Sequence, residues 1–374
     1  MVALALLLPL FYLALMANYI RAWQQIPPWD LPKGYWPVTS IDVIIPARNE
    51  AAQLSACLQS VIKTNYPEDL LSVYVVDDHS TDQTAVIAQQ FADQFPQINF
   101  IQLTEESQFS KKQALSAGIK AGRGKLIVCT DADCEVPADW LQFFSSYFEA
   151  KQAVFIAAPV NFHRERNLLE RFQSLDFLGM MLITGAGIHQ AWMHMSNGAN
   201  LAYTREAYES INGFEGIDHL ASGDDILLMQ KMVQAFPNQI GFLKNTGARV
   251  YTTAQSSWSG FIQQRLRWAT KSSVYPEWKI TLALAVVFFS CWMILVSLVL
   301  AIWDIRFLGL FLFQISIKSG IDYIFLKKAS QFFNRGDLMS SFFPAQVLHI
   351  LYIAGIGLMA NLFKTYQWKG RKVR

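Results

Sequence analysis

The sequence is short of charge. Only 16% of its 374 residues are Asp, Glu, Lys or Arg, whereas 52% are hydrophobic. This composition is too apolar for an ordinary water-soluble two-domain protein, so a membrane is expected among its partners. The formal net charge is only +2. Because no strong basic field results, we expect no nucleic acid as a partner.

Paired cysteine motifs and a dinucleotide-binding fingerprint are also missing. The four cysteines form no CxxC pair, which disfavours a redox motif and predicts reduced, structural thiols. No GxGxxG follows the first predicted strand, where a nicotinamide-dependent Rossmann enzyme carries it. A nicotinamide-dependent oxidoreductase is therefore disfavoured.

Long hydrophobic runs lie near both ends of the chain. Residues 1–22 predict an N-terminal transmembrane anchor, because the first twenty residues carry no charge. No basic residue precedes this run and no clear small-x-small site follows it, which favours an anchor over a cleaved signal peptide. Arg21 and Lys33 come after the run and place the next domain in the cytosol. We therefore expect an integral protein of the inner or plasma membrane.

A second membrane region is predicted over residues 279–364, followed by a basic tail over 365–374. Its three predicted spans cover about 280–303, 307–326 and 342–363. Four spans starting from an outside N-terminus would leave the basic tail outside, against the positive-inside tendency. Either the middle or the last segment is then re-entrant or interfacial, or the tail departs from the rule.

The middle span contains two opposite charges. Lys318 and Asp322 are four residues apart, so they share a helix face and can pair. The alternative is that they only snorkel or lie at a buried helix contact.

Residues 38–256 predict an α/β domain with a mostly parallel, Rossmann-like sheet. Short β-branched runs alternate there with helical patterns. The predicted strands cover residues 41–47, 71–78, 98–103, 125–133 and 153–159, and the predicted helices cover 50–64, 82–95 and 111–121. In such sheets ligands bind beyond the carboxyl ends of the strands.

Polar residues follow three of the predicted strands. They are Arg48, Asn49 and Glu50 after the first, Asp77 and Asp78 at the end of the second, and Asp131 and Asp133 at the end of a later one. The DxD carboxylates can present oxygen ligands to a hard divalent cation that also holds a diphosphate. A turn with a helix cap explains a lone DxD equally well. The adjacent pair Asp77 and Asp78 needs a cation, amide donors or a ligand, because it ends a hydrophobic strand.

Three later segments add candidates. Residues 165–195 predict an interfacial helix, because they are too polar at their start and too short in their apolar part for a span. Asp224 and Asp225 begin a predicted helix, where the helix dipole favours carboxylates. Residues 257–278 predict an amphipathic interfacial helix. Its alternative role is to hold anionic lipid headgroups through Arg265 and Lys271.

In this order, PARNE, VVDDHSTD, SKKQAL, DAD, GDD and QRLRW resemble the membrane-bound family 2 glycosyltransferases, which include cellulose, hyaluronan and poly-N-acetylglucosamine synthases and ceramide glucosyltransferase. The resemblance runs from about Asp42 to Trp268. It implies a glycosyltransferase domain of the A type, flanked by transmembrane helices. Two positions depart from the family pattern: Ser110 replaces a glycine before Lys111, and Asp224 replaces a glutamate.

The resemblance also implies a role for each matching residue. The implied residues are Asn49, Glu50, Asp77, Asp78, Lys111, Asp131 and Arg267 for the donor nucleotide, Asp131 and Asp133 for Mg²⁺ or Mn²⁺, Asp225 and Asp224 for catalysis, and Gln264, Trp268, Asn197 and Gly198 on the acceptor side. Asp225 is the implied general base. Lys111 also has an ordinary explanation, because most lysines at such positions are simply solvated.

The expected function is inverting transfer of a hexose or N-acetylhexosamine. The donor would be a nucleotide diphosphate sugar, expected to be a UDP-sugar, and the acceptor a lipid or lipid-linked glycan, with a β-linked product. The alternative is a processive synthase and exporter of a β-linked polysaccharide, which the QxxRW motif favours. Against it, the few spans would leave a narrow pore without a second copy or an export partner. A receptor that binds a nucleotide sugar without catalysis is disfavoured, because all the expected acids are present.

Overall fold

The protein is described here from a computed structural model that covers residues 2–104, 111–220, 223–270, 275, 277–362, 366–368 and 371–373. The chain forms two compact units that alternate along the sequence. The membrane unit consists of Met1–Ile26, Arg164–Met193 and Ala254–Arg374, and the sheet unit consists of Pro27–His163 and His194–Thr253.

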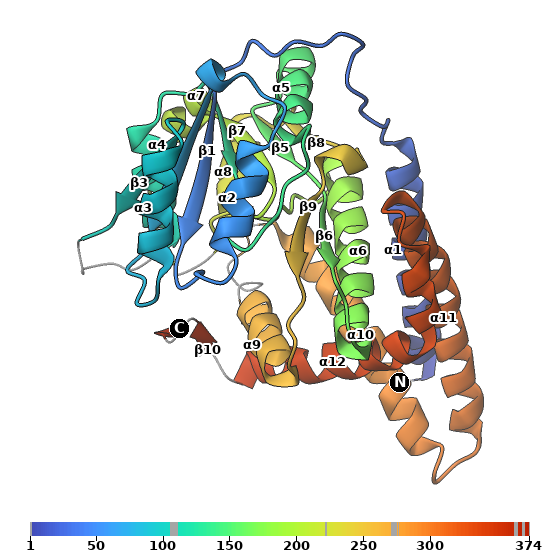
Figure 1. Ribbon diagram of the computed structural model, residues 1–374. Helices are drawn as coiled ribbons and strands as arrows, with labels where there is room; N and C mark the ends of the chain where they lie inside the picture. The colour runs from blue at the N-terminus through green and yellow to red at the C-terminus, as the bar shows by residue number, and fades with distance from the viewer. Residues whose placement is uncertain are drawn as a thin grey trace. The chain divides into compact units, whose positions relative to one another are not determined.

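The sheet unit contains a seven-stranded sheet in the order β3-β2-β1-β4-β7-β5-β8 (Figure 1). Its strands are β1 Ile41–Ala47, β2 Leu71–Asp77, β3 Ile98–Gln102, β4 Leu126–Cys129, β5 Phe155–Ala157, β7 Leu201–Thr204 and β8 Ile240–Phe242. The strands β3, β2, β1 and β4 are parallel, and β7 runs antiparallel to β4 and β5. The predicted α/β class with a mostly parallel sheet is confirmed.

Helices pack on this sheet. Its strands are apolar because their side chains are buried beneath these helices. The helices of the unit are α2 Leu54–Ile62, α3 Thr84–Gln94, α4 Lys111–Ala121, α5 Trp140–Lys151, α7 Arg205–Ser210 and α8 Ile226–Ala235. Six of the seven side chains of β1 are buried, as expected for a strand covered on both faces. At Gly118, α4 lies so close to the sheet that a Cβ would come within 2.9 Å of Ile44 and 3.1 Å of Val76.

The parallel register places the candidate residues at one edge of the sheet. Ala47 of β1 is aligned with Asp77 of β2, and Ile44 of β1 with Cys129 of β4. The chain therefore leaves these three neighbouring strands on the same side, just before Arg48, Asp78 and Asp131. A second, two-stranded sheet pairs β6 Val160–His163 with β9 Val250–Thr253.

The membrane unit is built of long helices. They are α1 Val2–Gln25, α6 Leu168–His189, α9 Trp258–Ala269, α10 Trp278–Leu300, α11 Arg306–Phe332 and α12 Phe342–Leu362. Within the part of the chain that the structure describes, four helical segments are long and apolar enough to cross a bilayer: Ala5–Gln25, Trp278–Leu300, Arg306–Phe332 and Gly336–Ala360. Helix α6 packs against α1, α11 and α12. The remaining short elements are η1 Glu68–Leu70, η2 Thr246–Ala248, η4 Gly336–Ser341, β10 Tyr366–Trp368 and β11 Arg371–Val373.

A proline inside α1 creates a contact with α11. Pro9 has no backbone N–H, so the carbonyl of Ala5 loses the hydrogen bond that it would accept within the helix. Gln314 of α11 replaces the missing donor: its Nε2 donates to the Ala5 carbonyl oxygen at 3.0 Å. Because an unsatisfied carbonyl is costly in hydrocarbon, this bond joins the two helices at a fixed position.

The charges of the middle span form a buried ion pair. Lys318 Nζ lies 2.5 Å from Asp322 Oδ2, and the two side chains are only 2% and 7% exposed. Tyr12 of α1 donates to Asp322 Oδ1 at 2.5 Å, and Gln346 of α12 donates to Asp322 Oδ2 at 2.8 Å. The predicted pairing is confirmed, and its place is a buried contact of three helices.

Candidate active site

The loops that follow β1 and β2 are tied together by polar contacts. The Asn49 side chain accepts a hydrogen bond from the backbone N–H of Thr81 at 2.8 Å, and the backbone N–H of Asn49 donates to Ser80 Oγ at 2.9 Å. The backbone N–H of Glu50 donates to Thr84 Oγ1 at 2.8 Å. Asn49 and Glu50 therefore hold the loops after β1 and β2 together.

Both loops contain a non-glycine residue in the left-handed region. Asn49 has a φ of 52° and His79 a φ of 57°. Asparagine adopts this conformation more readily than most residues because its amide bonds to nearby backbone, as it does here. Strained backbone of this kind clusters at ligand sites, where the surrounding contacts hold it in place.

Asp77 and Asp78 are buried carboxylates whose oxygens are only in part satisfied by neighbouring groups. Asp77 Oδ2 accepts from the Ser80 N–H at 3.2 Å. Asp78 Oδ1 lies 3.1 Å from His79 Nδ1 and 3.9 Å from Arg48 Nη1. Burial raises the pKa of Asp78, although His79 and Arg48 oppose the rise. Asp77 Oδ1 is buried and has no hydrogen-bond partner within the described ranges.

Lys111 joins two acidic segments that are far apart in the sequence. Its Nζ lies 2.6 Å from Asp131 Oδ1, after β4, and 3.1 Å from Asp224 Oδ2, before α8. We call Lys111, Asp131 and Asp224 the open cluster, because their side chains are 21%, 35% and 10% exposed. Burial lowers the pKa of Lys111, but the carboxylates of Asp131 and Asp224 outweigh it and hold the pKa well above its usual value. Lys111 is thus a fixed cation, not a freely solvated lysine.

The position of Lys111 at the start of helix α4 determines which partners its charge needs. Lys111 is the first residue of α4, where the helix dipole disfavours a positive charge and favours an anion. The lysine therefore depends on its carboxylate partners, and a diphosphate would meet both Lys111 and a helix N-terminus. Residues 105–110, including Ser110, lie outside the described residues.

The Asn197–Gly198 loop and Asp225 border the open cluster. The Gly198 N–H donates to Asp225 Oδ2 at 3.0 Å, and the Ile226 N–H donates to Asp225 Oδ1 at 2.8 Å. Asp225 is thus the N-cap of α8, and this structural role accompanies any catalytic one. A Cβ on Gly198 would lie 2.9 Å from Lys111 Nζ, so a larger residue at this position would require the lysine side chain to shift. The Asn197 side chain accepts from the Ala199 N–H at 2.9 Å and shapes this turn.

A metal ion would need ligands beyond the protein. Among the residues that the structure describes, no three His, Cys, Asp or Glu side chains converge to hold a metal. Asp131 and Asp133 supply carboxylate oxygens of the kind that Mg²⁺ and Mn²⁺ prefer. Because one Asp131 oxygen already binds Lys111, the pair fits a divalent ion only together with further oxygens, such as those of a diphosphate.

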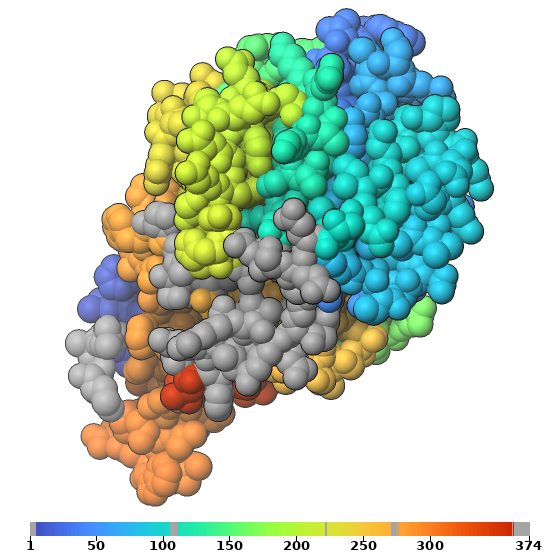
Figure 2. Space-filling view, turned by 90° about the vertical axis from the view of Figure 1, so that its left-hand side faces the viewer, coloured from blue at the N-terminus to red at the C-terminus, as the bar shows by residue number. Residues whose placement is uncertain are grey.

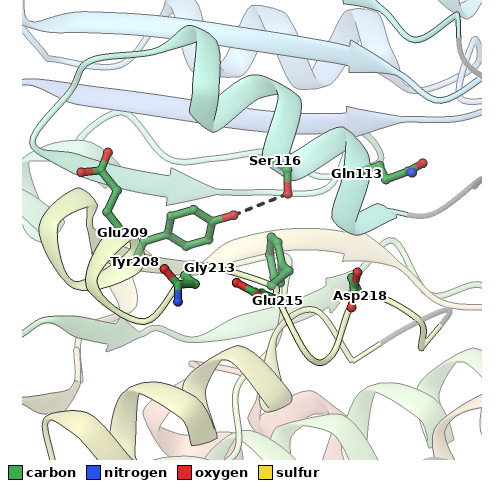
Figure 3. Close-up of a pocket in the computed structure, with 9 residues that line it drawn as sticks. Gln113, Ser116, Tyr208, Glu209, Gly213, Glu215 and Asp218 are labelled. Atoms are coloured by element: carbon green, nitrogen blue, oxygen red, sulfur yellow. Dashed lines mark hydrogen bonds between the residues drawn. The ribbon is translucent and has the colours of Figure 1, made fainter.

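A separate cavity of about 490 Å³ lies between α4 and the segment that follows β7. These two segments lie side by side on the surface of the sheet unit (Figure 2). Gln113 and Ser116 of α4 face Tyr208, Glu215 and Asp218 across the cavity, and the Tyr208 hydroxyl lies 3.5 Å from Ser116 Oγ (Figure 3). None of the predicted donor, metal or catalytic residues lines this cavity.

The QxxRW residues lie on α9 of the membrane unit. Gln264, Arg267 and Trp268 are partly exposed. Arg265 is not available to lipid headgroups: its side chain is 3% exposed and forms an ion pair with Asp176 of α6 at 3.0 Å. The suggested lipid role of Arg265 is therefore wrong, because a buried partner holds its charge. Lys271 lies outside the described residues.

Sequence reasoning placed Arg48 at the strand end but did not predict its contact with Asp78, and it missed the supporting roles of His79 and Asn200. Arg48 donates to the backbone oxygen of Asp78 at 2.7 Å, and His79 contacts the same aspartate. Asn200 is fully buried and donates to the backbone oxygens of Pro159 and Ala248. The run VVDDHS placed His79 beside an acid, but no pattern in the sequence indicated the partners of Asn200.

Comparison with known proteins finds a family model that matches part of this chain, together with several similar enzymes. Residues 42–211 match the family model "Glycosyl transferase family 2". The chain is 28% identical over 243 residues to a beta-monoglucosyldiacylglycerol synthase from Synechocystis sp., covering 62% of this chain and 48% of that protein. It is 29% identical over 161 residues to a dolichyl-phosphate beta-glucosyltransferase from Trichomonas vaginalis, covering 39% and 47%. The chain thus spans about half the length of these curated relatives.

A solved structure shows the same fold. It is a mannosyltransferase from Pyrobaculum calidifontis in complex with GDP-Man and Mn²⁺. The two superimpose with a TM-score of 0.58 at 19% identity, over 93% of this chain and 98% of that one. At this identity the likeness concerns the fold alone.

Proposed function

From the premise that this chain carries a glycosyltransferase domain of family 2, we propose that it transfers a sugar from a nucleotide diphosphate donor to a lipid or lipid-linked acceptor. The proposed donor is a UDP-sugar. Attack from the face opposite the leaving group inverts the anomeric centre, so an α-linked donor gives a β-linked product.

The open cluster is the observation that carries this proposal. A partly exposed lysine between two carboxylates, at the carboxyl edge of a parallel sheet and at a helix N-terminus, is suited to a ligand with mixed charge. Phosphate oxygens can take the place of a carboxylate on Lys111, while Asp131 is released to bind a cation. The loops around Asn49, Glu50 and Asp78 are proposed to hold the nucleoside.

Asp225 is the proposed general base. One of its oxygens accepts from the Gly198 N–H and the other from the Ile226 N–H, so the carboxylate is oriented. Asp225 takes the hydroxyl proton as the acceptor oxygen attacks the anomeric carbon. Asp224, bound to Lys111 at 3.1 Å, is proposed to keep that lysine beside the leaving diphosphate.

Asp131 and Asp133 are the proposed ligands of Mg²⁺ or Mn²⁺. When bound, the ion would neutralise the charge that grows on the leaving diphosphate. Two carboxylates after β4 and the oxygens of the donor make a hard oxygen set, which suits either ion. The metal requirement can be tested directly: chelation should abolish turnover, and either ion should restore it, whereas full turnover in chelator would end the metal assignment.

For Gln264, Arg267 and Trp268 the proposal rests on the family resemblance. Arg267 would neutralise diphosphate charge, and Trp268 and Gln264 would border the acceptor, together with Asn197 and Gly198. For the cell we propose an integral protein of the inner or plasma membrane, with the sheet unit in the cytosol. The apolar helices and the lipid substrates in the names of the relatives support this placement.

The decisive experiment measures nucleoside diphosphate release by detergent-purified protein. The assay uses a panel of UDP- and GDP-sugars with Mn²⁺, with and without membrane lipid extract. Lipid-dependent release from one donor, with a labelled product of one or a few sugars in the lipid fraction, is the expected result. A long polymer would instead support a processive synthase, and no release under any condition would contradict transfer.

A further inference from the structure

Arg265 lies inside the sequence QRLRW, but it faces the interior of the membrane unit. Its side chain is 3% exposed, and Nη2 donates to Asp176 Oδ2 at 3.0 Å. Asp176 belongs to α6 and is itself only 8% exposed. A buried arginine needs such a partner, because an unpaired charge in a low-dielectric interior is costly.

The guanidinium of Arg265 also packs against the ring of Trp268. Its central carbon lies 4.3 Å from the centroid of the Trp268 ring, 5.0 Å from that of Phe261 and 5.9 Å from that of Tyr352. A planar cation over an indole face is a favourable arrangement, and more so away from water. Phe177 of α6 contacts the same indole, with ring centroids 6.2 Å apart.

Asp176 is the group that fixes this arginine. Within the described part of the chain, Nε and Nη1 of Arg265 have no hydrogen-bond partner, so Asp176 supplies its one hydrogen bond. Asp176 is held in turn by Tyr352, whose hydroxyl lies 3.5 Å from both carboxylate oxygens, and His349 Nε2 lies 4.0 Å away on the same helix α12. Three helices, α6, α9 and α12, thus determine where the guanidinium lies.

We propose that Asp176 and Arg265 are positioning residues for Trp268. The chain of contacts runs from Asp176 through the Arg265 guanidinium to the indole ring. It fixes the ring of the residue that, in the proposed function on which this inference rests, borders the acceptor sugar. The two residues touch neither donor nor acceptor. They set the angle at which a sugar can stack on Trp268 and therefore act on turnover.

The test compares two variants with a matched control. Asp176→Asn removes the charge that anchors Arg265, and Arg265→Lys keeps the charge but removes the planar group under the indole. Glu165→Gln is the control: it breaks another arginine–carboxylate pair of the same unit, in which Arg335 donates to both Glu165 oxygens at 2.9 Å. Thermal unfolding and nucleoside diphosphate release are measured for each purified protein with varied donor and acceptor.

Asp176→Asn and Arg265→Lys are each expected to lower kcat per folded molecule by about 10- to 100-fold, since small misplacements at a reacting centre have effects of this size. The KM for the donor should change little. Glu165→Gln should lower the unfolding temperature and leave kcat within about twofold. If Asp176→Asn does not fold, Arg265→Lys carries the test alone, because it keeps the ion pair.

Two outcomes distinguish a failure of this inference from a failure of the proposed function. If the wild-type protein turns over and both variants keep its kcat while only their unfolding temperature falls, the pair is purely structural and the inference is overturned. If the wild-type protein releases no nucleoside diphosphate from any donor, the proposed function fails first, and the inference falls with it.

Discussion

Lys111 and Lys318 are both bound by carboxylates, but the two settings differ in exposure and in where the partners lie in the sequence. Lys111 takes its partners from two loops of the sheet unit, at 2.6 and 3.1 Å, and the three side chains are 10% to 35% exposed. Lys318 takes Asp322 from the same helix at 2.5 Å, and neither side chain is more than 7% exposed. Tyr12 and Gln346 fill the remaining positions on Asp322.

This contrast separates an ion pair that can exchange partners from one that cannot. Water reaches the open cluster, so a phosphate or a metal can replace one carboxylate contact at small cost. Around Lys318, a lost partner leaves a charge without solvent, and the penalty is large. We therefore expect changes in the open cluster to affect turnover, and changes at Lys318 to affect stability.

The largest effect is expected beside the open cluster. Asp225→Asn should lower turnover by about 10²- to 10⁴-fold while donor binding persists, because the amide cannot take the acceptor proton. The asparagine oxygen can still accept one of the two backbone hydrogen bonds that Asp225 receives, so the fold should survive. Asp93→Asn, on the surface of α3, is the matched control. Unchanged turnover in Asp225→Asn would remove the residue from its role as base.

At the buried pair of Lys318 and Asp322, the expected effect is a loss of stability. Lys318→Met leaves Asp322 buried without its cation and should destabilise the protein by about 3–5 kcal/mol. The double variant Lys318→Met, Asp322→Leu removes both charges and should recover most of that loss. Unfolding of the purified protein in detergent measures both. Equal instability of the single and double variants would show that the ion pair itself, not the orphaned charge, matters.

Lys111→Met tests the same contrast, because it makes at Lys111 the substitution proposed above for Lys318. Loss of one charge-assisted contact to the donor, worth about 1.5–3 kcal/mol, should lower kcat/KM for the donor by at least about 10-fold. Stability should change less than in Lys318→Met, because Asp131 is 35% exposed and water can solvate it. Steady-state kinetics and unfolding on the same preparations give both values. A stability loss as large as that of Lys318→Met would erase the distinction between the two lysines.

The sequence predicted five of the seven strands of the main sheet, because these five have strong local signals, whereas β7 and β8 were not predicted. The run IDVIIPA became β1 with the predicted limits 41–47, and the helix expected over 111–121 is α4. Both elements carry continuous apolar runs or clear helical periodicity. The location of the polar residues after β1, β2 and β4 was also predictable, because parallel strands end at the same edge of a sheet.

Contacts between segments that are distant in the sequence could not be predicted. Nothing near Lys111 indicates that it binds Asp224, more than a hundred residues away, and Arg265 looked like a surface cation because its helix is amphipathic. Pairing with Asp176 overrode that pattern. Such contacts depend on how helices pack, which residue spacing alone does not determine. The Lys318 and Asp322 pair was predictable because both residues share one helix face.

The contact between Pro9 and Gln314 offers a smaller effect within the membrane unit. Gln314→Leu should cost about 1–2 kcal/mol, because the Ala5 carbonyl loses its donor. In the background of Pro9→Ala, a backbone N–H can serve that carbonyl, so the same Gln314→Leu change should cost clearly less. Unfolding of the four proteins completes the double-mutant cycle. Additive effects would show that Gln314 does not substitute for the missing helical bond.

The smallest effect is expected at an ion pair of intermediate exposure. Burial raises the pKa of Glu165, but hydrogen bonds from Arg335 and Ser174 outweigh it and hold the pKa below its usual value. A carboxyl with a lowered pKa binds its proton more weakly in the folded state. It therefore stabilises the fold above the pKa of the unfolded chain, and this contribution is lost as the pH falls through the lower, folded pKa. The stability difference between wild type and Glu165→Gln should accordingly shrink when unfolding is followed from neutral pH into this acidic range. A difference that stays constant with pH would mean that the charge of Glu165 contributes nothing, and the pair would then match neither Lys111 nor Lys318.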